Sequence, residues 1–291
     1  MNAARLKIIA SMVIFGTIGI FRRYIPMDSS LIALVRGAVG TLFLLAVVLL
    51  GKKGLNWQAI RRKLPLLVLS GAAMGFNWIL LFEAYNHTTV ATATLCYYMA
   101  PILVILLSPL MLRQHLTKKK LLCVAVALIG MVLVSGVLES GGTTGWTGIA
   151  LGLSAAALYA SVVLMNQFMG SVPAMDKTIL QLLSAAAAML PYVLWTVDFS
   201  AQPTNALALI MLLVVGVVHT GIAYWLYFGA MGKVPAQAAA LLSYLDPVIA
   251  ILLSALVLGE KMTLLTSAGA VLVLGATMIS EMPGHTKSGQ E

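Results

Sequence analysis

Asp246 is an acidic residue in the middle of an apolar stretch, about eleven residues from where that stretch begins, and Pro247 follows it directly. A carboxylate in hydrocarbon surroundings costs about 2.5 kcal/mol or more, so an acid in such a place is interpreted as functional. Pro247 cannot donate a backbone hydrogen bond, which predicts a free carbonyl one turn earlier. The pair therefore indicates a polar notch for a proton, a cation or an amine. The alternative is an acid neutralised by a neighbouring helix or by Arg36.

Four other polar side chains lie within apolar runs or at their ends. Arg36 lies about a turn and a half into the second run, where it pairs with Asp246, binds a substrate or snorkels to the surface. Glu83 stands at the outer end of the third run and is either a coupling charge or a solvated helix end. Asn166 and His219 lie within runs, where interhelical hydrogen bonding is the alternative to substrate contact.

Aromatic side chains in the same runs could shape a binding space. Trp78 and Tyr224 are 146 residues apart, and so are Tyr98 and Tyr244, each of which precedes a proline by one turn. Aromatic residues at the ends of membrane helices are usually interface anchors, but these four lie deeper. We expect them to line a pore together with Tyr97, with plain packing as the alternative.

The chain that carries these residues has the composition of a membrane protein. It has 291 residues, of which 61% are hydrophobic and 9% charged, and its mean hydropathy is +1.00. A helix that crosses a bilayer needs about 20 apolar residues. The apolar runs predict an all-α integral membrane fold of ten transmembrane helices, at 6–25, 30–50, 64–85, 89–112, 121–138, 147–168, 176–197, 206–229, 235–257 and 263–281.

The basic residues are divided unevenly between the two ends of these helices. The net charge is +9, but Lys and Arg lie in short clusters between apolar runs, which is typical of a membrane protein and not of a nucleic-acid surface. With a cytoplasmic N-terminus, 14 of the 18 lie in inner segments, and only Arg22, Arg23 and Lys261 lie in outer loops. This distribution predicts two cytoplasmic termini and no nucleic-acid partner.

The sequence also contains an internal repeat. Residues 75–117 align without a gap on residues 221–263, and Pro101 matches Pro247. The alignment predicts a duplication, with one five-helix unit over 1–140 and another over 146–284. Because five is odd, the second unit enters the membrane from the opposite side, so the repeats are inverted. The two prolines are expected to break equivalent helices.

Motifs for hydrolysis and metal chemistry are absent from the sequence. There is no GxxxxGK[ST], HExxH or GxSxG motif and no Cys/His cluster. We therefore predict no enzymatic activity, no metal and no cofactor. Gly71 and Gly75 are spaced four apart, which predicts a closely packed pair of helices.

The stretch LSYLDPVIAILLSALVLGEKMTLLTSAGAVLVLGATMI, which begins at Leu242, resembles the repeat of the EamA-type family of the drug/metabolite transporter superfamily. The resemblance rests on the acid–proline pair, the small and apolar residues after it, Gly259–Glu260 and a last helix rich in small residues. It covers the whole chain as ten helices in two halves. It implies a carrier of a bacterial-type inner membrane, often an exporter of amino acids or other small metabolites.

The first half departs from the family's pattern. Ala100 precedes Pro101 where an acid could stand, and Gln114 replaces the acid found at Glu260. Phe15 stands where the family's first helix often has tryptophan. Asp246 is therefore the single acid of its kind in this chain.

Together these features predict a secondary transporter that works by alternating access around a central aromatic cavity, exporting small metabolites with proton coupling through Asp246. The alternatives are an uncoupled facilitator, a multidrug or amine exporter and, in a different class, a non-transporting scaffold or a lipid-modifying enzyme. A small molecule and the lipid bilayer are the expected partners, while the substrate, the direction and the oligomeric state, a monomer included, stay open. The expected substrate contacts and coupling charges are Trp78, Tyr97, Tyr98, Asn166, His219, Tyr224, Tyr244, Asp246, Arg36 and Glu83.

Overall fold

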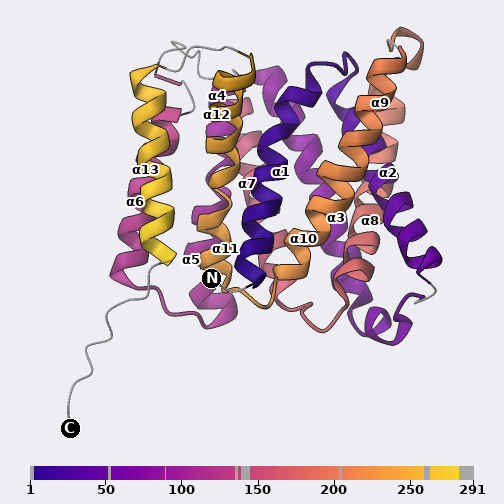
Figure 1. Ribbon diagram of the computed structural model, residues 1–291, viewed down its shortest axis with the longest axis horizontal. Coiled ribbons are helices and arrows are strands. Elements are labelled where there is room, and N and C mark those ends of the chain that lie inside the picture. The colour runs from indigo at the N-terminus through magenta and orange to yellow at the C-terminus, as the bar shows by residue number, and fades with distance from the viewer. Residues whose placement is uncertain are drawn as a thin grey trace.

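The computed structural model describes residues 3–51, 54–88, 90–134, 137–138, 145–202, 205–258 and 263–281, and its regular elements over these residues are helices (Figure 1). The first half contains α1 (Ala3–Arg22), α2 (Ser29–Leu50), α3 (Trp57–His87), α4 (Val90–Tyr97), α5 (Ala100–Leu112) and α6 (Lys118–Val134). The second half contains α7 (Trp146–Gln167), α8 (Ala174–Thr196), η1 (Phe199–Ala201), α9 (Ala206–Val214), η2 (Val215–Ile222), α10 (Ala223–Ala230), α11 (Ala236–Leu242), α12 (Leu245–Leu258) and α13 (Leu264–Glu281).

Over the described residues, eight helical stretches are long and apolar enough to cross a membrane. They are Ala3–Arg22, Ser29–Leu50, Trp57–His87, Thr92–Leu112, Trp146–Gln167, Ala174–Thr196, Ala206–Ala230 and Ala236–Val257. The outer surface of the bundle is apolar, since Trp195 is 90% exposed and Leu50 is 82% exposed, as expected of side chains that face lipid. The predicted all-α integral membrane class is confirmed. The number ten stays a prediction, because α6 and the apolar run Leu264–Ser280 are shorter.

Two of these stretches are interrupted in the middle. α4 and α5 are separated by Tyr98–Met99, and α11 and α12 are separated by Ser243–Tyr244. Pro101 lies in the first turn of α5 and Pro247 in the first turn of α12. Proline is tolerated there because the first amides of a helix have no partner within that helix. At these interruptions the backbone leaves the regular helix, and one tyrosine lies in each, Tyr98 in the first and Tyr244 in the second.

Each helix of the first half has a counterpart about 146 residues later, and the contacts between helices come in matching pairs. α1 packs against α12 and α10, while its counterpart α7 packs against α5 and α3. α2 packs against η2, and its counterpart α8 packs against α3. Two further contacts join a helix to its own counterpart, namely α2 with α8 and α6 with α13. A two-fold axis that exchanges the halves would produce this pattern.

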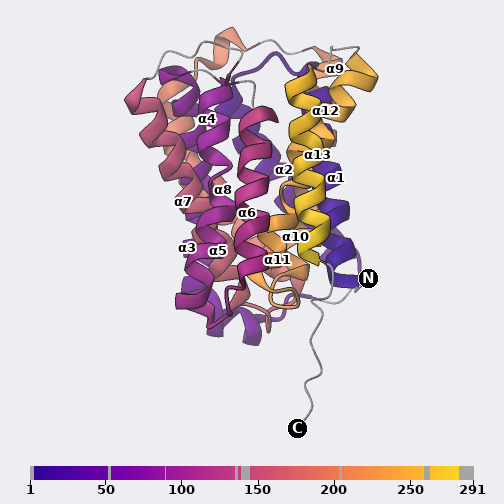
Figure 2. The same cartoon turned by 90° about the vertical axis from the view of Figure 1, so that its left-hand side faces the viewer.

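The counterparts α6 and α13 run antiparallel at one side of the bundle, where Figure 2 shows them next to each other. Gly130 of α6 faces Leu272 and Val273, whereas Val134, further along α6, faces Gly269, which is nearer the start of α13. α1 begins and α13 ends at the same, lower end of the bundle in Figure 1. Opposite directions of counterpart helices are what inverted repeats require.

Glycines let α3 and α8 touch backbone to backbone. A Cβ added to Gly71 would lie 2.5 Å from the carbonyl oxygen of Gln181, and one added to Gly75 would lie 2.6 Å from that of Ala185. The close packing predicted from the spacing of these glycines is confirmed.

Candidate functional site

A cavity of about 460 Å³ lies between α1, α2, α3, α4, α7, η2, α10 and α12. It reaches from Asp246, near the middle of the bundle, to Arg22 and Ser29, where α1 ends and α2 begins. This is the upper end of the bundle in Figure 1. Volumes of this size are typical of sites that enclose small molecules. Six of the residues singled out from the sequence line it, namely Arg36, Trp78, Tyr97, Tyr98, Tyr224 and Asp246.

Arg36 is held in the cavity by stacking and not by an ion pair. Its guanidinium carbon lies 4.5 Å from the centroid of the Trp78 ring, a cation–π distance. Its Nε is buried without a hydrogen-bond partner among the described residues. The structure describes both Arg36 and Asp246, and no ion pair joins them. The alternative in which Arg36 neutralises Asp246 is therefore not observed.

Asp246 is partly buried and lies where two cavities meet. It lines the 460 Å³ cavity and also a chamber of about 50 Å³ that includes Met12, Pro101 and Ser243. The carbonyl that Pro247 was expected to leave free is that of Ser243, but it accepts the Asp246 amide at 3.3 Å. The expectation of a free carbonyl is therefore wrong, because the helix break lets a closer amide replace the missing one.

α1 approaches α12 closely beside this acid. A Cβ added to Gly16 would lie 2.6 Å from the Ile249 side chain and 2.9 Å from the carbonyl oxygen of Asp246. Gly16 therefore allows the α1 backbone to contact the first turn of α12. This contact fixes where Asp246 stands relative to the aromatic residues of α1.

Aromatic rings form the walls of the cavity. Tyr224 lies with its ring centroid 5.0 Å from Phe15 and 6.2 Å from Trp78. Tyr97 lies 5.7 Å from Tyr159 and 6.1 Å from Tyr98. Both sets line the cavity, and such tilted and edge-on pairs stabilise its walls. The Tyr159 hydroxyl donates to the Tyr227 hydroxyl at 3.1 Å.

Three predicted substrate contacts lie outside the lining of the cavity. Tyr244 is fully buried and donates its hydroxyl to the Tyr98 carbonyl at 3.0 Å. Asn166 donates to the Val162 carbonyl one turn earlier in α7, at 2.9 Å. His219 is buried in the π-helical element η2 and contacts Thr17.

The Thr17–His219 contact joins α1 to η2 at 2.8 Å. The Thr17 hydroxyl also lies 2.7 Å from the Ile14 carbonyl, and the His219 tautomer decides which group donates across the Thr17–His219 contact. The π-helical geometry of η2 places the imidazole at this contact, and π turns often occur at functional positions.

Glu83, the third predicted charge, is also outside the lining. It accepts a hydrogen bond from the hydroxyl of Tyr192 of α8 and one from Nδ2–H of Asn86 at 3.5 Å.

Arg22 and Tyr85 line the cavity, although the sequence did not predict them as site residues. Arg22 donates to the Met27 carbonyl at 3.1 Å and to Ser29 at 3.3 Å, so it closes the α1–α2 turn. In the sequence, the one feature that could have pointed to Arg22 as a cavity residue was its position at the end of the first apolar run.

Toward the opposite end of the bundle a polar network joins the two halves. Lys120 of α6 donates to Gln237 of α11 at 2.6 Å, and Gln237 donates to Ser108 of α5 at 2.6 Å. Gln237 and Ser108 are fully buried.

Among the described residues, no group of three or more His, Cys, Asp or Glu residues could hold a metal ion.

The model of the EamA-like transporter family matches this chain twice, over residues 3–136 and over residues 146–282. The chain belongs to the EamA-like transporter family. This EamA-like transporter is 27% identical over 284 residues to the uncharacterized transporter YxxF of Bacillus subtilis, which covers 96% of this chain and 89% of the relative. It is 28% identical over 248 residues to Protein RarD of Salmonella typhi, covering 81% of this chain and 79% of the relative.

The EamA-like transporter is also similar to an uncharacterized transporter of Archaeoglobus fulgidus, at 29% identity over 283 residues, covering 96% of this chain and 97% of the relative. A solved crystal structure has the same fold, with a TM-score of 0.84 at 18% identity over 96% of each chain. The chain is therefore a multi-pass membrane protein of a transporter family, as its resemblance to that family implied.

Proposed function

We propose that this EamA-like transporter carries a small zwitterion, such as an amino acid, through the central cavity by alternating access. One observation supports this substrate class above others: Arg36 and Asp246 face the same aromatic cavity without pairing with each other. A substrate carboxylate would suit the guanidinium, and a substrate ammonium would suit the carboxylate. The apolar and aromatic walls would accept the remaining side chain.

Alternating access requires that one end of the cavity closes when the other opens. The cavity extends to the end where α1 meets α2, and the Lys120–Gln237–Ser108 network lies at the other end. The matching contacts of the halves and the double match of the family model support two inverted repeats, an architecture that places substrate between them. The exported substrate would enter after this network opens.

We further propose that a proton moves inward on Asp246 as substrate moves outward. Asp246 is the one acidic residue in the described lining of the cavity. The proposed setting is a bacterial-type inner membrane with both termini cytoplasmic, because the basic residues are concentrated at that end of the helices. We propose no enzymatic activity and no cofactor for the chain.

The test uses three substrates that share one ring and differ in charge. Proteoliposomes with purified protein would be offered labelled phenylalanine, phenethylamine and 3-phenylpropionate. We expect uptake of the zwitterion alone. Uptake of the amine alone would favour an amine exporter. The proposal would be contradicted if the protein took up none of the three compounds and no amino acid of a wider panel.

Single substitutions then separate the roles of the two charges. Asp246→Asn should abolish accumulation driven by a pH gradient and should also weaken exchange, because the carboxylate is the proposed contact for the substrate ammonium. Exchange at the wild-type rate with accumulation lost would leave Asp246 the proton role alone. Arg36→Gln should weaken zwitterion uptake at least tenfold by removing a charge-assisted contact. Arg61→Gln, an exposed arginine on α3, is the matched control and should behave as the wild type. Wild-type transport by Asp246→Asn in both assays would remove Asp246 from the mechanism.

A further inference from the structure

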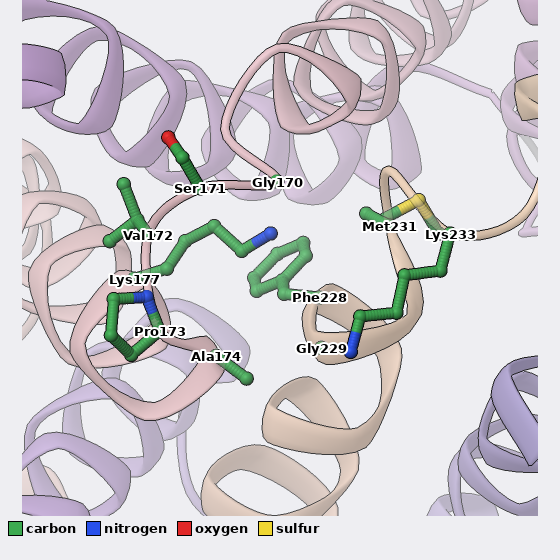
Figure 3. Close-up of a pocket in the computed structure, with 10 residues that line it drawn as sticks. All are labelled: Gly170, Ser171, Val172, Pro173, Ala174, Lys177, Phe228, Gly229, Met231 and Lys233. Carbon is green, nitrogen blue, oxygen red and sulfur yellow. The ribbon is translucent and has the colours of Figure 1, made fainter. Parts of the chain in front are cut away.

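A second pocket, separate from the central cavity, lies where the α7–α8 turn meets the α10–α11 turn (Figure 3). Its volume is about 180 Å³, roughly six times the ~30 Å³ that a water molecule occupies in the liquid. Two lysines, Lys177 and Lys233, line it, and no acidic residue belongs to the described lining. The pocket is therefore a concentrated positive site.

Lys177 is buried without a counter-charge. It is 1% exposed, and within the described part of the chain no hydrogen bond or ion pair reaches its ammonium group. Asp176, the next residue in the chain, accepts the Asn56 amide at 2.8 Å and does not line the pocket. Lys233 lies close enough to repel Lys177. A buried ammonium with only another ammonium nearby is unfavourable until an anion joins it.

The pocket also receives the N-terminus of a long helix. α8 begins at Ala174 with Pro173 as its N-cap, and no side chain caps its first amides. Both residues line the pocket. Uncapped first-turn amides and the helix dipole favour an anion at this place. Figure 3 shows the two lysine side chains reaching toward the pocket from α8 and from the α10–α11 turn.

Glycines bring the two walls of this pocket together. A Cβ added to Gly229 would lie 2.9 Å from the Ala174 side chain, so α10 approaches the first turn of α8 closely. Gly232 has a φ of +82°, which favours glycine, and a Cβ there would lie 3.1 Å from the Cα of Gly170. The α10–α11 turn therefore packs directly on the α7–α8 turn and covers Lys177.

We propose that this pocket binds one phosphate-type oxyanion, held by the ammonium groups of Lys177 and Lys233 and by the first amides of α8. Phosphate oxygens can accept hydrogen bonds from several N–H donors at once. The negative charge of the phosphate would offset the positive charges of the buried Lys177 and the neighbouring Lys233. The pocket lies at the end of the membrane helices, so the oxyanion is either free phosphate or the headgroup phosphate of an acidic lipid. Both would join α8 to the α10–α11 turn.

The experiment measures binding to the full-length protein, delipidated in an uncharged detergent. Inorganic phosphate would be titrated calorimetrically at constant ionic strength against chloride. In parallel, bound lipids would be counted by native mass spectrometry after adding phosphatidylglycerol or phosphatidylcholine. We expect one equivalent of phosphate or phosphatidylglycerol and none of phosphatidylcholine. Lys177→Met and Lys233→Gln should each weaken the binding at least tenfold.

Lys118→Gln is the matched control, because Lys118 is an exposed lysine at the start of another helix at the same end of the bundle. Its affinity should stay within twofold of the wild type. Saturable phosphate binding would identify free anion as the source, and binding of phosphatidylglycerol alone would identify the lipid headgroup. Absence of both, or equal binding by Lys233→Gln and the wild type, would overturn the proposal.

A thermal measurement separates an anion site from a structural lysine. Without added anion, Lys177→Met should melt at a higher temperature than the wild type, because it removes an unpaired buried charge while keeping a similar shape. Its melting temperature should no longer rise with the anion that binds the wild type. A lower melting temperature that still rises with the anion would contradict the site. If Lys177→Met does not fold, anion binding by Lys233→Gln, a change at an exposed position, decides whether the pocket is an anion site.

Discussion

Arg36 and Asp246 are the two charges on which the proposed substrate class depends. Each is an ionisable group in an apolar bundle, and each lacks an ionic partner in the described part of the chain. Arg36 is stabilised by the Trp78 ring at 4.5 Å, and Asp246 lines two cavities. Charges left unpaired in a cavity are available to a ligand, whereas a buried ion pair would have been satisfied within the protein.

Gly16 provides a residue-scale prediction. Gly16→Ala would force a methyl group to within 2.9 Å of the Asp246 carbonyl oxygen, so α1 must move away from α12. Overpacking of this kind costs about 1–3 kcal/mol. We expect a lower melting temperature and slower zwitterion transport. Gly19→Ala is the control, because nothing lies within 4 Å of its added Cβ, and it should melt no lower than the wild type. Equal behaviour of the two variants would show that the α1–α12 contact is not tight.

At the scale of elements, the two interrupted helices are joined at their breaks by a hydrogen bond. Tyr244, at the break between α11 and α12, donates its hydroxyl to the carbonyl of Tyr98, its counterpart at the break between α4 and α5. Such a contact between residues 146 apart is what two inverted repeats would produce near the axis that relates them. The same breaks place Tyr98 and Asp246 on the cavity.

Tyr244→Phe tests this junction. It removes the hydroxyl that satisfies the Tyr98 carbonyl and keeps the ring in a fully buried position. The expected loss is about 0.5–1.5 kcal/mol in the free energy of unfolding, the usual net value of one hydrogen bond. Tyr24→Phe, at a 49% exposed position, should change it by less than about 0.5 kcal/mol. Chemical denaturation in detergent measures both, and equal values for both variants would exclude a stabilising role for the bond.

For the whole molecule, the two ends of the bundle differ in structure. One end carries the opening of the 460 Å³ cavity, and the other carries the Lys120–Gln237–Ser108 network and the pocket with Lys177. We propose that the second end is cytoplasmic, because most basic residues lie there. The described conformation would then be open to the outside, ready to release an exported substrate.

Thiol labelling of intact cells tests this orientation. In a variant without its two native cysteines, Arg61→Cys at the start of α3 should resist an impermeant reagent, and Ala201→Cys in η1 should react. Both positions are exposed, so protection reports the side of the membrane and not burial. The reverse result would invert the topology and the proposed direction of the open cavity. Labelling after permeabilisation, when both should react, is the control.

The sequence by itself determined the membrane class and the family, because the length of an apolar span and a family motif are local properties of the chain. The number of ten spans and the two inverted repeats stay predictions. The tertiary structure decided which polar side chains share a cavity, because this depends on how each helix is rotated against helices far away in sequence. Asn166 and His219 thus bond to backbone or to α1, and Arg36 stacks on Trp78 and leaves Asp246 unpaired. In the sequence Lys177 resembles any basic residue at a helix end. The α10–α11 turn packs over it and makes it a buried charge that has no partner among the residues the structure describes.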